Sequence, residues 1–73
     1  MTPTMGRIVH YVEVVESGEV LSPAIIHHVH NDTCVDLHVF RKWGGASYVT
    51  SALLTSPGMG ATGWFWPPRV EAP

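Results

Sequence analysis

The feature that most constrains this chain is a succession of short apolar segments, each followed by a turn-forming stretch. Cys34–Phe40 (CVDLHVF) alternates valine and leucine with more polar residues, which is the period of a strand with one buried face. Arg7–Val15 is rich in β-branched and aromatic residues and stops at Glu16–Glu19, a turn-like tetrad that contains glycine. No stretch keeps apolar spacings of three and four over three turns, so we expect at most a helical turn, at Ser51–Leu54.

Three further segments complete a prediction of five strands. They are Ala24–His30, which follows Pro23 at a position where a strand tolerates proline, Ser47–Leu54, and Trp64–Trp66 after a glycine-rich crossing. Five short strands with glycine-rich connections favour a single all-β domain over residues 1–73, with an N-terminal arm at 1–6 and a proline-rich tail at 67–73. The predicted architecture is a small five-stranded SH3-like barrel, and an OB-like barrel is the alternative.

Length and composition narrow the functional classes. A chain of 73 residues has a thin core, and the single Cys34 cannot form a disulfide within the chain. Four Lys and Arg stand against six Asp and Glu, so nucleic-acid binding is disfavoured. Only 14% of the residues are charged while 45% are hydrophobic, which predicts that part of the apolar surface meets a protein partner or a second copy. We expect neither a signal peptide nor a membrane span.

The segment GWFWPP (63–68) has two interpretations. On a strand, Trp64 and Trp66 share one face and Phe65 takes the other. We favour the interpretation in which the tryptophans close the core, because aromatic side chains dominate small cores. The alternative is an aromatic groove for an extended or proline-rich segment, including the chain's own tail. Its candidate partner-binding residues are Trp43, Tyr48, Trp64 and Trp66.

The hairpin around Asn31–Thr33 allows two registers. A two-residue turn puts Ile26, His28 and His30 on the face of the valine and leucine side chains of 34–40. A three-residue loop instead puts Ile25, His27 and Val29 on that face. We favour the three-residue loop, which places six side chains together on the outer face: Ile26, His28, His30, Cys34, Asp36 and His38. This assignment predicts that Val35→Asp unfolds the protein and that Asp36→Val is tolerated.

Five of those side chains are potential metal ligands. Zinc accepts nitrogen, sulfur and oxygen ligands, and a His-x-His pair places two imidazoles on one face of a strand. The candidates are His28, His30, His38, Asp36 and Cys34. Such spacing also arises by chance, so we expect no bound metal and no metal-dependent folding. The alternative interpretation is an exposed histidine patch that becomes positive in mildly acidic solution.

Catalysis is not indicated. No dinucleotide-binding, P-loop or nucleophile-elbow pattern is present, and the glycines at 58, 60 and 63 lack a phosphate-binding spacing. A thiol hydrolase built on Cys34 would need an activating base and an oxyanion hole in a pocket that a chain this short can hardly form. We therefore expect no catalytic residue, no cofactor and no enzymatic activity.

Several motifs together carry a family resemblance that covers most of the chain. GRIVHYV at 6–12, PAII at 23–26, CVDLHVF at 34–40 and the closing Trp-x-Trp-Pro resemble a family of small proteins encoded by tailed bacteriophages and prophages. The resemblance implies an SH3-like fold and a phage setting, in the host cytoplasm or the virion, but it supplies no catalytic residue. Relatives usually carry a polar residue where this chain has Phe65, so the two faces of the last strand need not share one role.

The function expected from these features is that of a non-enzymatic phage accessory protein that binds a host or phage protein. Two alternatives remain open. One is a virion component that decorates a capsid or tail, and the other is an oligomer that sequesters a small ligand or nucleotide in an anti-defence role.

Overall fold

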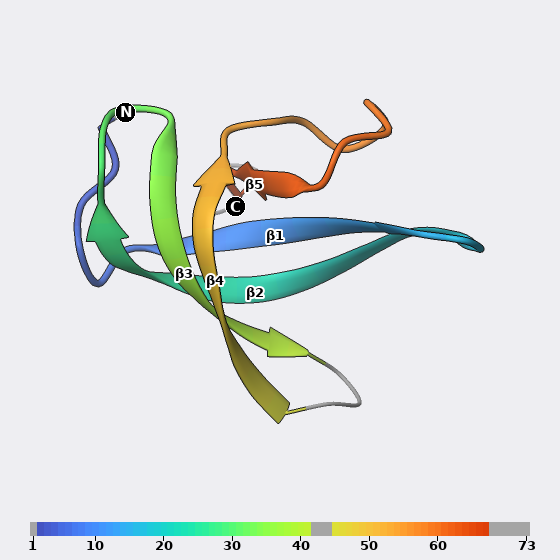
Figure 1. The fold of residues 1–73 in the computed structure, drawn as a ribbon, viewed down its shortest axis with the longest axis horizontal. Helices are drawn as coiled ribbons and strands as arrows, with labels where there is room; N and C mark the ends of the chain where they lie inside the picture. Colours follow the sequence, from blue (N-terminus) through green and yellow to red (C-terminus); the bar gives the residue numbers. More distant parts are fainter. Residues whose placement is uncertain (1, 42–44, 68–73) are drawn as a thin grey trace, which may run out of the picture.

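The computed structural model describes residues 2–41 and 45–67, which form one five-stranded antiparallel sheet (Figure 1). The strands are β1 (Ile8–Val15), β2 (Gly18–Val29), β3 (Cys34–Arg41), β4 (Gly45–Leu53) and β5 (Gly63–Phe65). Their order across the sheet is β4-β3-β2-β1-β5. The described residues contain no helix, and hence none long and apolar enough to cross a membrane. The all-β prediction with five strands is confirmed.

The sheet curls without closing into a barrel. Leu54, just beyond β4, forms an isolated parallel bridge with Trp64 of β5, and the Thr55 N–H donates to the Trp64 carbonyl at 2.8 Å. A Cβ atom on Gly63 would collide with the Leu53 carbonyl oxygen, so the close approach of β4 and β5 requires glycine there. Because the two edge strands approach each other, in residues 2–41 and 45–67, just around Gly63 and this bridge, the predicted SH3-like or OB-like barrel is an approximate description.

The core lies on the concave side of the curled sheet. Its buried side chains come from all five strands: Val9, Tyr11, Ala24, Ile26, Val35, Leu37, Val39, Ala52 and Trp64. Trp64 is 0% exposed, and its indole Nε1–H donates to the Thr33 carbonyl at 3.1 Å. Trp66 packs against this cluster with its ring edge-to-face with Trp64 at 5.2 Å. The core interpretation of the tryptophans is therefore correct, although β5 begins one residue earlier than predicted and ends at Phe65.

The β2–β3 hairpin combines both registers that the sequence allows. Ile26 pairs with Leu37 in the register of a two-residue turn, while Val29 pairs with Val35 in the register of a three-residue loop. The two registers are joined by a β-bulge at His27. The bulge lets Ile26 and Val29 both turn toward the core, so the prediction that Ile26 lies on the outer face is wrong. The same prediction put Ile25 and His27 on the core face, and both are exposed on the other side.

The second strand is longer than predicted. β2 begins at Gly18, which has a φ of 133°, and pairs with β1 from there onward, so Pro23 lies within the strand and not before it. Pairing with β3 begins only at Ala24. In the described part of the chain, no strand pairs with the other side of the preceding half of β2, and such an edge is where a strand accommodates a residue without an N–H donor.

The N-terminal arm is attached to the sheet. The Gly6 N–H donates to the Ile26 carbonyl at 2.7 Å, and the Ile26 N–H donates to the Arg7 carbonyl at 2.9 Å. Pro3 is buried. These contacts fix the chain beside β2 just before β1 starts, and they place Met5 at the border of the sheet's other face.

Candidate functional site

The face of the sheet opposite the core carries a row of apolar and aromatic side chains across four strands. The register places Ile8 beside Ile25, Ile25 beside His38, and His38 beside Tyr48. Paired residues of neighbouring strands share a face, so these four side chains lie together. Ile8 is 61% exposed, Tyr48 49%, and Phe40, next along β3 on the same face, 44%. We call the surface formed by these five residues the outer face.

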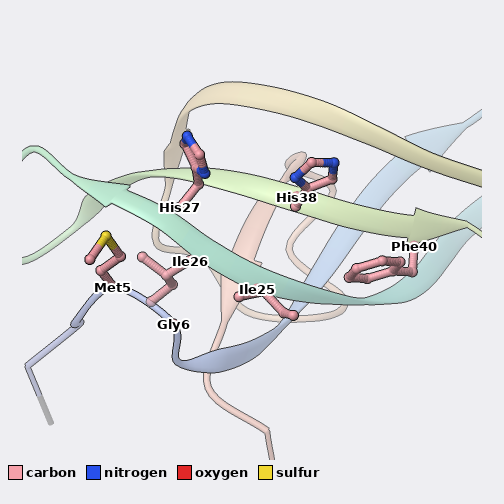
Figure 2. A pocket seen from close by; sticks show the side chains of 7 residues that line it. All are labelled: Met5, Gly6, Ile25, Ile26, His27, His38 and Phe40. Atoms are coloured by element: carbon pink, nitrogen blue, oxygen red, sulfur yellow. The ribbon is translucent and has the colours of Figure 1, made fainter.

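A hollow of about 320 Å³ lies on the outer face between β2, β3 and the N-terminal arm. Figure 2 shows the side chains around it, with Met5 at one end and Phe40 at the other. Its lining is Met5, Gly6, Ile25, Ile26, His27, His38 and Phe40. Gly6, with a φ of 87°, turns the arm so that Met5 forms a wall of the hollow. The hollow is predominantly apolar, and only the imidazoles offer polar side-chain atoms.

Aromatic rings cover the outer face beside this hollow. His38 stacks on Phe40 with ring centroids 6.0 Å apart, and His27 meets Tyr48 edge-to-face at 5.2 Å. The bulge brings the His27 ring to 6.4 Å from that of His38. Offset-stacked and edge-to-face arrangements are favourable for such rings. The four rings therefore form one semi-rigid aromatic surface.

Asp36 organises the polar end of this surface. Its carboxylate accepts hydrogen bonds from the Ser51 N–H at 2.8 Å, from His30 Nε2 at 2.9 Å and from the Tyr48 hydroxyl at 3.1 Å. The Ser51 bond first, and then the His30 bond, lower the pKa of Asp36 from 3.8 to about 2, although desolvation opposes them. Desolvation and the bond to Asp36 raise the pKa of Tyr48. The carboxylate thus fixes the Tyr48 ring in place.

The backbone around Asp36 explains how three donors reach one side chain. Both neighbouring strands bulge opposite it, β2 at His27 and β4 between Val49 and Ala52. Ser51 adopts a φ of 55° in the second bulge, which points its N–H at the carboxylate. Asp36 is therefore buried, which contradicts the exposed position assumed for it, and we now expect Asp36→Val to destabilise the fold because valine would leave these donors without their acceptor.

The candidate metal ligands do not form one cluster. His30 is bound to Asp36, and its ring lies 4.9 Å from that of His28. His38 packs between Phe40 and Tyr48, and Cys34 is partly buried. Residues 2–41 and 45–67 contain no group of three or more His, Cys, Asp or Glu side chains placed to hold a metal ion. The register of the three-residue loop holds at the tip of the hairpin, where His28 pairs with Asp36, but the bulge at His27 removes Ile26 from the predicted outer-face grouping.

The four predicted partner-binding residues do not lie on one surface. Tyr48 lies on the outer face, whereas Trp64 is fully buried and belongs to the core, which corrects its assignment to a binding surface. Trp66 is partly buried and borders a second apolar hollow of about 440 Å³ with His10, Leu21, Pro57 and Phe65. Trp43 lies outside the described residues.

Three residues of the outer face, Ile8, Ile25 and Phe40, were not expected as site residues. A sheet with one face in water alternates apolar and polar residues along each strand. Ile8, Ile25 and Phe40 break that alternation, since their neighbours Val9, Ile26 and Val39 already supply the core. In the sequence, apolar residues at consecutive positions of a strand were therefore the sign that both faces of the sheet carry apolar side chains.

Comparison with known proteins returns no match: no family model, no curated protein and no solved structure is significantly similar to this chain.

Proposed function

We propose that this chain is a small, non-enzymatic binding module that recognises a protein partner through its outer face. The observation that carries the proposal is the continuous row of exposed Ile8, Ile25, His38 and Tyr48 across four strands. Scattered apolar residues are normal on any surface, whereas a contiguous patch is characteristic of an interaction site.

The composition of the outer face supports a protein partner. Interface centres are enriched in aromatic residues and depleted in charged ones. The outer face combines two isoleucines with aromatic rings, and the one carboxylate at its end, Asp36, is buried beneath the hydroxyl of Tyr48 and not exposed to solvent. The hydrogen bond to Asp36 and the ring contacts with His27 hold Tyr48 in one orientation, which reduces the entropy lost on binding.

The chemistry around Asp36 supports a role in positioning and not in catalysis. A general base needs a carboxylate that can take a proton near neutral pH. The pKa of Asp36 is lowered to about 2, and its oxygens already accept from Ser51, His30 and Tyr48. The resemblance to small phage proteins makes a host or phage protein the partner that we propose.

The test is affinity capture from a bacterial lysate with two matched variants. Ile8→Asp places a charge on the outer face, whereas Met59→Asp places the same charge on a side chain that is 71% exposed in the loop before β5. Both should fold, as judged by circular dichroism, because both positions are exposed. A protein captured by the wild type and by Met59→Asp but lost with Ile8→Asp supports the proposal. Equal capture by both variants, or no specific capture by the wild type, contradicts it.

A further inference from the structure

Two imidazoles whose charge depends on pH lie on and beside the outer face. His38 lies in the middle of the row, between Ile25 of β2 and Tyr48 of β4. His27, at the bulge of β2, lines the same hollow, and its ring centroid is 6.4 Å from that of His38 (Figure 2). Histidine is the side chain that gains or loses its charge between about pH 5 and pH 8. A change of pH in this range therefore turns the centre of an apolar surface into a charged one.

The side chains in ring contact with His38 carry no negative charge. Its ring meets those of Phe40 on β3, His27 on β2 and Tyr48 on β4, with centroids 6.0, 6.4 and 6.3 Å away. The N-terminal arm contributes Met5 and a glycine to the hollow. An imidazolium at this position therefore depends on water for its stabilisation, and a second one on His27 would repel it.

The carboxylate of Asp36, two residues before His38 on β3, already has its partners. It accepts hydrogen bonds from the Ser51 N–H, from His30 and from the Tyr48 hydroxyl. The bonds from Ser51 and His30 lower its pKa to about 2, so it stays ionised in mildly acidic solution and keeps Tyr48 in place. Mild acid therefore changes the charge of the imidazoles without releasing the network that positions Tyr48.

We propose that protonation of His38, and of His27 beside it, releases a partner from the outer face, so that binding is strong near neutral pH and weak in mild acid. This switch rests on the proposed function, because it concerns a partner that covers the outer face. Such a partner excludes water from His38, and an imidazolium without water or a counter-charge is strongly disfavoured. The proton has to leave before the partner binds, which reduces the apparent affinity in acid.

The kind of partner follows from the hollow. Met5, Ile25 and Phe40 give it apolar walls, and only the imidazoles add polar side-chain atoms. We therefore expect the partner to place an uncharged, apolar group beside His38. A partner with a carboxylate at this position would bind more tightly in acid, which is the opposite sign.

Nile red, an uncharged dye that fluoresces in apolar surroundings, tests the switch without a known partner. Its dissociation constant is measured at about pH 7.5 and at about pH 5.5. The variants are His27→Gln/His38→Gln and, as a control with the same number of imidazoles removed, His10→Gln/His28→Gln. His28 meets His30 at 4.9 Å and His10 borders the second hollow, so neither control position lies beside His38.

The readout is the ratio of the two dissociation constants within each variant, so a change in affinity at neutral pH does not enter. For the wild type and the control we expect binding that is about tenfold weaker at the lower pH, as for one imidazole that must be neutral in the complex. For His27→Gln/His38→Gln we expect a ratio close to one. Phe40→Asp locates the dye, because it places a charge in the wall of the hollow and should abolish binding.

The outcomes separate the switch from the proposed function. If the wild type does not bind Nile red at neutral pH, or if Phe40→Asp binds it equally well, the outer face takes up no apolar group, and both proposals fail. If Phe40→Asp abolishes binding but the wild type binds equally well or more tightly in acid, only the switch is overturned. The switch is also overturned if His27→Gln/His38→Gln keeps the pH dependence of the wild type, or if the control loses it.

Discussion

Replacement of Trp64 by alanine should unfold the protein. The indole is 0% exposed and contacts the core from the shortest strand. Deleting a buried tryptophan side chain costs about 3–5 kcal/mol. The Thr33 carbonyl would also lose one of its two donors and keep only the Leu54 N–H, which adds up to about 1 kcal/mol. A core of this size supplies roughly 3–5 kcal/mol in total, so nothing would remain to hold the fold.

The assay is urea unfolding followed by circular dichroism at one fixed protein concentration. Trp66→Ala is the matched control, because Trp66 packs on the same cluster from a partly exposed position and its loss should cost only about 1–2 kcal/mol. Trp64→Phe should fall between the two, since it keeps an aromatic ring but loses the hydrogen bond to Thr33. If Trp64→Ala retains a cooperative transition within about 1 kcal/mol of the wild type, the role assigned to this tryptophan is wrong.

Four further outcomes follow from the structure. Val35→Asp should unfold the protein in the same urea assay, because it places a carboxylate at a fully buried position at a cost of several kcal/mol; a folded variant would contradict the assigned face. The pKa of Asp36 is lowered from 3.8 to about 2, so its contribution to stability is complete above pH 3.8 and is lost as the pH falls through about 2. Acid titration should show that part of the pH dependence in the wild type and not in Asp36→Asn, and identical profiles would speak against the network. Gly63→Ala should destabilise the fold by about 1–3 kcal/mol in thermal melts, because its Cβ collides with the Leu53 carbonyl, and an unchanged melting temperature would refute that contact. EDTA should leave the melting temperature of the wild type unchanged, whereas a large drop would restore the metal site.

The sequence pattern was sufficient to predict a strand and its buried face where one face of the strand is apolar and the other is polar. The alternation of Val35, Leu37 and Val39 predicts β3 and its buried face, and the structure confirms both. The placement of Trp64 in the core also follows from sequence, because a chain of this length has few other large side chains. Pattern failed in β2, where apolar residues occupy both faces and the favoured register of a three-residue loop put Ile26 on the wrong side of the sheet.

The sequence by itself determined that this chain forms short strands without a long helix, and that its closing aromatic segment packs inward. The spacing of apolar residues and the residue types are local properties of the chain, so they can be read without knowing which segments become neighbours. Only the tertiary structure decided the bulge at His27, the burial of Asp36 and the continuity of the outer face. Each of these depends on which strands become neighbours. The three donors to Asp36, for example, come from Tyr48 and Ser51 of β4 and from His30, which follows β2. A bulge relieves a conflict between two pairings, and that conflict exists only once the sheet has formed.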